Sequence, residues 1–291
     1  MNNSRIIFIG TSSFAVPILE KLIEHKYQIL AIITGLDKPS GRKKELTLSP
    51  VKQTGLKHKL SILQPKRISD LYDKISQLKP DLIITASYGQ IIDKKILDIP
   101  HYGSVNLHPS LLPKYRGPSP IQTAILNGDQ KTGISIMLMD EKMDHGPIIS
   151  QKEIKISSND TYQSLDKKLS LESASFLIKI LPQYIKEQIK PQTQDESQAS
   201  YSKMLTRQDG KIDWEKTTEA IERKVRAFYP WPGTWTDLNG KRIKILKAKA
   251  ISKKQEASLP TGDGFLTLEL VQPEGKKPMT GQEFFRGYRR K

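Results

Sequence analysis

Residues 103–122 read GSVNLHPSLLPKYRGPSPIQ, and residues 134–146 read ISIMLMDEKMDHG. The first stretch begins as an apolar run that carries Asn106 and His108, and Pro109 ends it, because proline cannot donate to a strand ladder. Residues two apart on a strand point to the same face. One strand end therefore presents an amide and an imidazole side by side. Ligands of open α/β folds bind at this edge of the sheet, so we expect a site for acyl chemistry here.

The pair Asn106 and His108 suits the transfer of an acyl group to an amine. An amide can donate to a developing oxyanion, and an imidazole can carry the proton that an attacking amine loses. Asp144 follows the second apolar run and can hold the imidazole in one tautomer. Asp140 is a competing acid in the same loop, and spacing does not decide between the two. An Asn-x-His pair alone is more often hydrogen-bonded scaffold, but the proline-rich loop after it favours function.

The composition of the 291 residues excludes several kinds of site. There is no cysteine, which excludes disulfides, thiolate metal ligands and a cysteine nucleophile. No spacing of histidines and carboxylates matches a metal site, so we expect no metal. The N-terminal apolar run is too short for a signal peptide, and no apolar stretch is long enough to span a membrane. We therefore expect a cytoplasmic protein with no membrane partner.

The first half of the chain alternates short apolar strands with helical segments, which is typical of a mostly parallel sheet covered on both faces. We expect strands at residues 5–9, 28–34, 80–87, 103–107 and 134–139. Apolar spacing predicts one long helix across residues 161–188, packed on this sheet. A single Gly10 follows the first strand where a dinucleotide-binding fold would have GxGxxG, so that fold is not supported.

The second half of the chain predicts a separate, smaller domain. A polar stretch without periodicity indicates a linker at residues 190–205, between a catalytic domain (1–189) and a C-terminal domain (206–291). The C-terminal part is expected to contain a helix at residues 217–228. Its other apolar runs have a period of two and are separated by Gly and Pro turns, which indicates a compact β-barrel.

The positive charge of the chain favours a polyanionic partner. The net charge is +16, and from Lys203 onward there are 20 lysines and arginines against 11 aspartates and glutamates. Nucleic-acid phosphates suit such an excess, although a lysine-rich surface without this function would look the same. Residues 35–52 form a polar loop whose basic cluster, Arg42, Lys43 and Lys44, suits phosphates, and a solvated flexible loop is the alternative.

Together these segments resemble the methionyl-tRNA formyltransferase family, a branch of the folate-dependent formyltransferases. The resemblance covers nearly the whole chain. It rests on FIGTSSFAVPILEKLI, KPSGRKKELTLSPVK, VRAFYPWPGTWT, LVQPEGKKPMTGQEFFRG and the two stretches quoted at the start. The HPSLLP and MDxG patterns point to the chemistry, whereas the basic loop, YPWPGTW and QPEGKK point to the tRNA enzymes.

The resemblance implies an α/β, Rossmann-like formyltransferase domain with a mostly parallel sheet, followed by a small OB-like β-barrel. It implies a monomer that transfers the formyl group of 10-formyltetrahydrofolate to the α-amino group of methionyl initiator tRNA, for initiation of translation. Asn106 would bind the formyl oxygen, His108 would polarise the formyl group and move the proton, and Asp144 would orient His108. The folate would lie against Ser110, Leu111, Leu112 and Pro113, and the tRNA against Arg42, Lys43 and Lys44.

The chain departs from the family pattern in two places. Lys142 and His145 lie beside Asp144, where the family has a small residue and a threonine or similar. Between Ala250 and Gly264 the chain lacks about one hairpin of sequence, so we expect a smaller barrel that is open on one side. Three alternatives fit the same residues: a formyltransferase for an amino sugar nucleotide, a hydrolase that releases formate, and a non-catalytic RNA-binding relative.

Overall fold

The computed structural model describes residues 4–40, 45–238 and 240–289. The chain divides into two compact units, which are described here one at a time. The first unit comprises residues 1–118, 132–154 and 166–201, and the second comprises residues 119–131, 155–165 and 202–291. The domain limits predicted from the sequence, 1–189 and 206–291 with a linker at 190–205, stay a prediction.

A seven-stranded sheet forms the centre of the first unit, in the order β5-β2-β1-β6-β7-β8-β9. Its strands are β1 (Arg5–Gly10), β2 (Gln28–Ile33), β5 (Ile62–Leu63), β6 (Leu82–Ala86), β7 (Ser104–His108), β8 (Lys131–Leu138) and β9 (Ile148–Lys155). The pairs from β5 to β7 are parallel, and β8 runs antiparallel to β7. Each of the parallel strands therefore ends at the same edge of the sheet.

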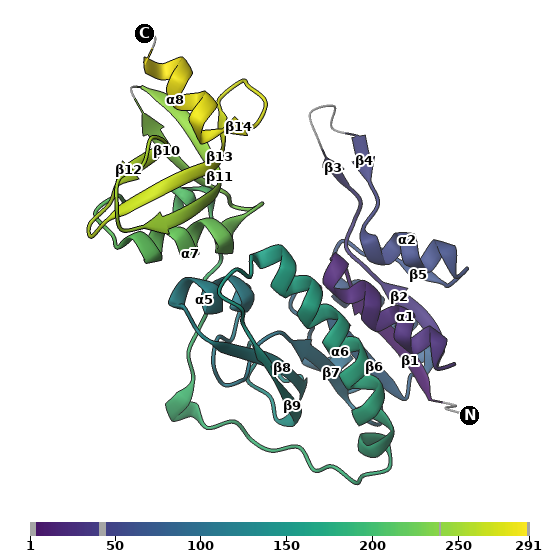
Figure 1. The fold of residues 1–291 in the computed structure, drawn as a ribbon. Coiled ribbons are helices and arrows are strands. Elements are labelled where there is room, and N and C mark those ends of the chain that lie inside the picture. Colours follow the sequence, from purple (N-terminus) through teal and green to yellow (C-terminus); the bar gives the residue numbers. More distant parts are fainter. Residues whose placement is uncertain (1–3, 41–44, 239, 290–291) are drawn as a thin grey trace. The chain divides into compact units, whose positions relative to one another are not determined.

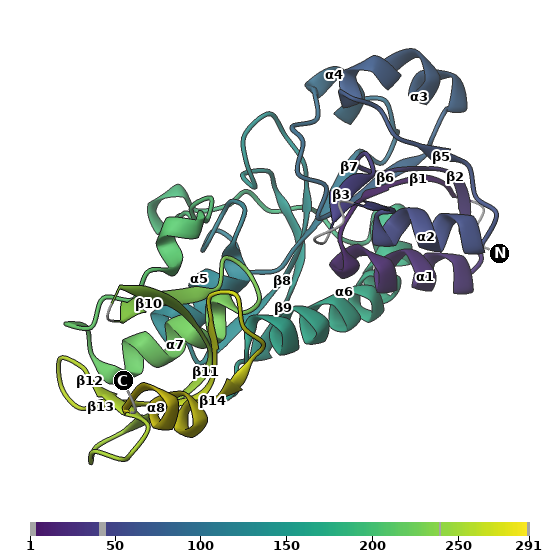
Figure 2. The same cartoon turned by 90° about the horizontal axis from the view of Figure 1, so that it is seen from above.

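Helices cover both faces of this sheet (Figure 2). They are α1 (Val16–Glu24), α2 (Pro50–Lys57), α3 (Tyr72–Leu78), α4 (Lys94–Leu97) and α6 (Tyr162–Ile185). Figure 2 shows α3 and α4 on one side and α1, α2 and α6 on the other. Ile7, Ile9 and Ile83 pack with Ile75 and Ile96 in one fully buried cluster. Burial on both faces explains why the central strands are apolar without alternation.

A small hairpin, β3 (Lys38–Ser40) and β4 (Glu45–Thr47), lies between β2 and α2. Figure 1 shows it projecting away from the sheet of the first unit. The side chains of Glu45, Leu46 and Thr47 are all exposed. Strand β4 therefore contributes no side chain to the core.

An antiparallel sheet forms the second unit, in the order β10-β11-β13-β12, with β14 paired to β13. Its strands are β10 (Thr234–Leu238), β11 (Lys241–Ile251), β12 (Ser258–Pro260), β13 (Phe265–Pro273) and β14 (Met279–Thr280). The helices of this unit are α5 (Pro120–Asn127), α7 (Thr218–Phe228) and α8 (Gly281–Arg289). Ile221 and Val225 of α7 and Phe284 of α8 pack on Ile243 and Leu268 of the sheet.

The fold class predicted from the sequence is confirmed: an α/β unit with a mostly parallel sheet and a smaller antiparallel β unit. In the described part of the second unit the pairing runs from β10 to β12 without joining those two strands, so the sheet is open on one side. The sequence missed β5 and β9 because the first has only two residues and the second is a half-exposed edge strand. No helix in the described ranges is long and apolar enough to cross a membrane.

Candidate active site

The site predicted from the sequence lies at the edge where β1, β6 and β7 end. Gly10 of β1 pairs with Ala86 of β6, and Thr85 of β6 pairs with Asn106 of β7, so the three strand ends lie together. His108 is the last residue of β7 and lies opposite Ser135 of β8. Open α/β sheets bind their ligands at this edge.

Asn106, His108 and Asp144 are brought together there. The amide nitrogen of Asn106 donates to Oδ1 of Asp144 over 3.4 Å. Nδ1 of His108 lies 3.6 Å from Oδ2 of the same carboxylate, which is too long for a hydrogen bond and close enough for an ion pair when the ring is protonated. His108 is 4% exposed. Burial beside one carboxylate oxygen strengthens the electrostatic interaction of any proton that Nδ1 acquires.

The other ring nitrogen of His108 fixes the tautomer. Nε2 lies 3.0 Å from the carbonyl oxygen of Tyr115, and a carbonyl can only accept, so Nε2 carries the proton. Nδ1 of the neutral ring then presents its lone pair on the side of Asp144. The ring is thus arranged to take up one proton at Nδ1 and hold it next to the carboxylate.

Local backbone geometry aims Asp144 at this ring. Asp144 has a φ of 49°, in the left-handed region, and its Oδ2 accepts a 2.8 Å bond from the backbone N–H of Gly117. A side chain at Gly146 would collide with the carbonyl oxygen of Leu138, so the turn requires glycine. Asp140, the other acid of this loop, instead contacts Nδ1 of His145 over 2.6 Å.

Two polar side chains, one from β8 and one from β9, form hydrogen bonds with the backbone of the loop after β7, residues 109–118. Oγ of the fully buried Ser135 donates to the carbonyl of Ser110 over 2.7 Å and accepts from the N–H of Leu112 over 3.0 Å. The amide nitrogen of Gln151 donates to both the carbonyl of Leu112 and Oγ of Ser135, over 2.8 Å each. The loop therefore has a fixed backbone, which a precise site needs.

The four residues predicted to line the folate belong to this loop. Ser110 and Leu112 are buried, and Oγ of Ser110 donates to the carbonyl of Lys114 over 2.6 Å. Leu111 and Pro113 are half-buried. The structure thus gives Ser110 a contact within the loop and Leu112 contacts with Ser135 and Gln151 of the sheet. The role of all four residues toward folate stays a prediction.

Residues 190–201 also form hydrogen bonds with this loop. The guanidinium of the fully buried Arg116 donates to Oε1 of Gln194 over 2.9 and 3.1 Å and to the carboxylate of Glu196 over 2.6 and 3.0 Å. These bonds to Glu196 raise the pKa of Arg116 above its ordinary value, and the guanidinium lowers the pKa of the Glu196 carboxyl. The N–H of Tyr115 also donates to Oγ of Ser200 over 3.0 Å.

The predicted tRNA cluster, Arg42, Lys43 and Lys44, lies outside the described residues. The base of the hairpin that carries it is described. The ammonium of Lys52 lies 2.5 Å from the carboxylate of Asp37, and Gln64 donates to Asp37 over 2.9 Å and to the carbonyl of Gly35 over 2.7 Å. The bond from Lys52 lowers the pKa of Asp37.

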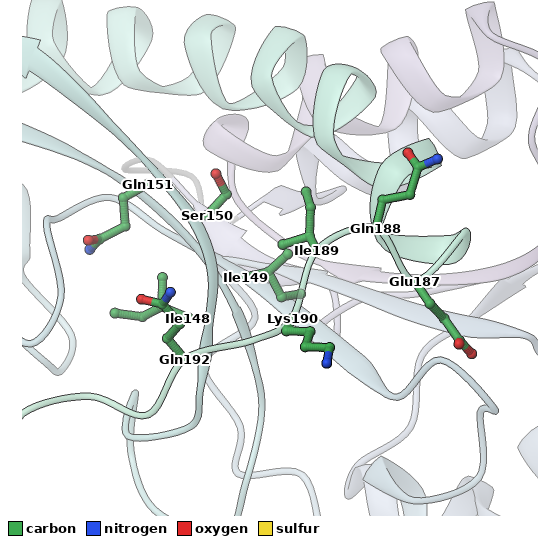
Figure 3. Close-up of a pocket in the computed structure, with 9 residues that line it drawn as sticks. All are labelled: Ile148, Ile149, Ser150, Gln151, Glu187, Gln188, Ile189, Lys190 and Gln192. Carbon is green, nitrogen blue, oxygen red and sulfur yellow. The ribbon is translucent and has the colours of Figure 1, made fainter.

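A hollow of about 570 Å³ lies elsewhere in the first unit (Figure 3). Figure 3 shows its walls, which come from β9 and from the chain that follows α6. Asn106, His108 and Asp144 do not line it, although Gln151 does. Nowhere in residues 4–40, 45–238 and 240–289 do three histidine, aspartate or glutamate side chains gather as a metal site would require.

The sequence can now be compared with known proteins. Residues 4–181 match the family described as Formyl transferase, and residues 204–289 match its C-terminal domain. The chain belongs to the formyl transferase family. It is 42% identical over 300 residues to the methionyl-tRNA formyltransferase of Bacillus subtilis, which covers 98% of this chain and 95% of that protein. The resemblance seen in the sequence motifs is therefore confirmed.

Solved structures of other proteins share this fold. HypX from Aquifex aeolicus in complex with tetrahydrofolic acid has a TM-score of 0.69 and 17% identity, covering 97% of this chain and 47% of that chain. An N-formyltransferase from Helicobacter canadensis, in complex with folinic acid and dTDP-3-aminofucose, has a TM-score of 0.69 and 20% identity. It covers 92% of this chain and 98% of its own. At this level of identity the likeness concerns the fold.

Sequence reasoning missed the residues that hold this candidate site in place. Ser135 is a fully buried residue of β8 and Gln151 an exposed residue of β9, and a single polar residue in a strand carries no local signal of such a role. Arg116 carried a weak signal, as a cation between a tyrosine and a Gly-Pro pair in a loop expected to be functional. Gln194 carried none, because it lies in a polar segment that favours a linker.

Proposed function

We propose that this protein transfers the formyl group of 10-formyltetrahydrofolate to the α-amino group of methionyl initiator tRNA. The observation that carries the proposal is the contact of Asn106, His108 and Asp144 at one strand end, in a chain that is 42% identical to a methionyl-tRNA formyltransferase along nearly its whole length. We further propose that it works in the cytoplasm, as a monomer, at the start of translation.

In this proposal Asn106 binds the formyl oxygen. The amine nitrogen of the acceptor attacks the formyl carbon, a carbon–nitrogen bond forms, and negative charge develops on the oxygen. An amide N–H fixed by a carboxylate is aimed without reorganisation, which is the property that makes an oxyanion donor effective. The bond from Asn106 to Asp144 leaves the second amide hydrogen for the substrate.

His108 and Asp144 move the proton. The attacking amine becomes positively charged and must lose a proton before the bond from the formyl carbon to N10 of the folate breaks. Nδ1 of His108 takes up that proton beside the carboxylate of Asp144, and the same proton then goes to N10 as tetrahydrofolate leaves. One proton is transferred from the amine to N10 and none is lost to solvent.

The folate would lie in front of the loop after β7. Leu111 and Pro113 offer half-exposed apolar surface, and Ile91 and Met143 are strongly exposed apolar side chains on the loops after β6 and β8. Exposed apolar side chains beside polar catalytic groups suit a flat, partly polar ring system. Ser110 and Leu112 would then support this surface through the loop backbone.

The tRNA would be held by phosphate contacts from each unit. Arg42, Lys43 and Lys44 would reach the acceptor end. In the second unit, β11 buries Ile243 and Ile245 and exposes the basic side chains between and beside them. Arg242 and Lys244 lie on the face opposite Ile243, and the register shift after Ile245 brings Lys247 and Lys249 to that face. Period-2 patterning thus gives one basic face, suited to a polyanion.

An amino sugar nucleotide is the second candidate acceptor, because a structural neighbour of the same fold was solved with dTDP-3-aminofucose. The test measures kcat/KM for methionyl initiator tRNA and for a dTDP-amino sugar, with 10-formyltetrahydrofolate as donor in both. We expect transfer to the tRNA alone. Transfer to the sugar, or release of formate without an acceptor, would replace the proposed acceptor while keeping the formyl chemistry.

A charge variant sharpens this test. Arg42→Ala together with Lys43→Ala should raise KM for the tRNA by about 10-fold and flatten its salt dependence, since each lost phosphate contact lowers the log–log slope by about 0.9. Lys94→Ala with Lys95→Ala on α4 removes the same charge elsewhere and is the matched control. Equal effects of the two pairs would show that the hairpin makes no specific contact.

A further inference from the structure

Gln194 occupies an unusual place for a residue in a polar connecting segment. Its neighbours from Thr193 to Gln198 are exposed, yet Gln194 is only 5% exposed. Buried amides are retained where their hydrogen bonds are complete. Those of Gln194 are complete within the first unit: its oxygen accepts two bonds and its nitrogen donates two.

The two ends of this amide bind two different loops. Oε1 accepts from Nε and Nη2 of Arg116, in the loop after β7. Nε2 donates to the backbone carbonyls of Asp144 over 2.9 Å and Gly146 over 2.8 Å, in the loop after β8. Gln194 thus fixes the separation of these loops. We call Gln194, Arg116 and the two carbonyls the Gln194 clasp.

Both loops hold a partner of His108. The carbonyl of Tyr115, next to Arg116, accepts from Nε2 of His108, and the carboxylate of Asp144 lies beside Nδ1. Tyr115 has a φ of 59° and Asp144 a φ of 49°, conformations that side chains rarely adopt unless their surroundings impose them. The Gln194 clasp binds the backbone of Asp144 directly and binds the loop of Tyr115 through the side chain of Arg116.

We propose that Gln194 is a positioning residue for formyl transfer, which acts by setting the two contacts of His108 through the Gln194 clasp. Glu196 strengthens the clasp by holding the far side of the Arg116 guanidinium. The inference rests on the proposed function, because it concerns the same imidazole. It assigns a catalytic purpose to a segment that the sequence presents only as a linker.

The experiment measures single-turnover formylation of methionyl initiator tRNA by the full-length protein. Gln194→Met removes all four bonds at nearly constant volume, and Gln194→Glu keeps the acceptor for Arg116 but removes both donors. We expect each to lower the rate of transfer by about 10-fold or more, with KM for tRNA and folate within about 2-fold, because small displacements of catalytic groups are costly. Gln192→Met and Gln192→Glu, at an exposed position of the same segment, are the matched controls.

A double-variant comparison separates positioning from general loss of structure. In a His108→Ala background the imidazole is absent, so Gln194→Glu should slow transfer by less than about 2-fold. An equal loss in both backgrounds would overturn the proposal, as would no loss in either.

A second readout is independent of transfer. With ¹⁵N-labelled histidine, the ring resonances of His108 should shift in Gln194→Glu and stay unchanged in Gln192→Glu. Unchanged His108 resonances in Gln194→Glu would count against the clasp. If the wild-type protein transferred no formyl group, the proposed function would fail while this measurement still decided whether Gln194 positions His108.

Discussion

The loop after β7 and the loop after β2 leave the same edge of one sheet, yet they are held in different ways. Residues 109–118 are bound by Ser135 and Gln151 of the sheet and, through their own Arg116, by Gln194. Residues 35–49 are bound at their base, and the described residues of β4 are exposed. Chemistry needs reacting groups fixed to a fraction of an ångström, whereas contact with a large polyanion needs reach and charge.

The largest expected effect concerns His108, the last residue of β7, from which the loop of residues 109–118 begins. His108→Ala should lower kcat for formyl transfer by about 10²-fold or more, because general acid–base catalysis contributes at least that much. The affinity for tRNA should stay within about 2-fold. Steady-state kinetics and a filter-binding titration measure the two quantities. His25→Ala, at the exposed end of α1, is the control, and equal losses for both histidines would refute the role of His108.

The next effect concerns Ser135, which forms hydrogen bonds with the backbone of residues 109–118. Ser135→Ala removes the donor to Ser110 and leaves the N–H of Leu112 without its partner, so the backbone beside His108 should relax. We expect kcat to fall by about 10-fold with little change in KM. Ser175→Ala, at an exposed position of α6, is the control. A rise in KM for tRNA at constant kcat would place Ser135 in substrate binding instead.

A smaller effect concerns the base of the hairpin. Asp37→Asn removes the ion pair with Lys52 and should raise KM for tRNA by about 3-fold at constant kcat. The direction of the change in KM is informative, because removing a negative charge would by itself strengthen binding to a polyanion and lower KM. Asp98→Asn, which breaks an exposed pair with Lys94, reports that charge effect. If both variants lowered KM equally, the hairpin base would have no positioning role.

The smallest effect lies in the second unit and is a dependence on pH. Bonds from Lys203 and Thr206 lower the pKa of Asp209 from 3.8 to about 2. A carboxyl with a lowered folded-state pKa stabilises the fold above its unfolded value and loses that contribution as pH falls toward 2. In urea unfolding, the wild type should therefore exceed Asp209→Asn in stability near neutral pH, with a difference that shrinks from about pH 4 downward. A difference that stays constant would contradict this assignment.

Much of the architecture was predictable because it rests on local pattern. Arg5–Gly10 and Leu82–Ala86 are apolar runs that only a strand covered on both faces explains, and the helix Tyr162–Ile185 follows from its apolar spacing. The strand end with Asn106 and His108 was equally readable, since Pro109 marks where pairing stops.

The remaining features depend on contacts between distant residues. Spacing gave no means to choose between Asp140 and Asp144, and the choice follows from the N–H of Gly117, 27 residues away from Asp144. Gln194 meets Arg116 across 78 residues, and no local preference records such a pair. Short elements such as β5 were missed because two residues carry no periodicity.

The most direct test is the rate of a single round of formyl transfer. Purified protein is mixed with 10-formyltetrahydrofolate and methionyl initiator tRNA, and a single round of formyl transfer is timed for the wild type and for Asn106→Ala. We expect rapid transfer by the wild type and a rate about 10²-fold lower in the variant, because one oxyanion donor is removed. The affinity for tRNA should stay unchanged. Equal rates for the two proteins would contradict the claim that Asn106, His108 and Asp144 form the catalytic site.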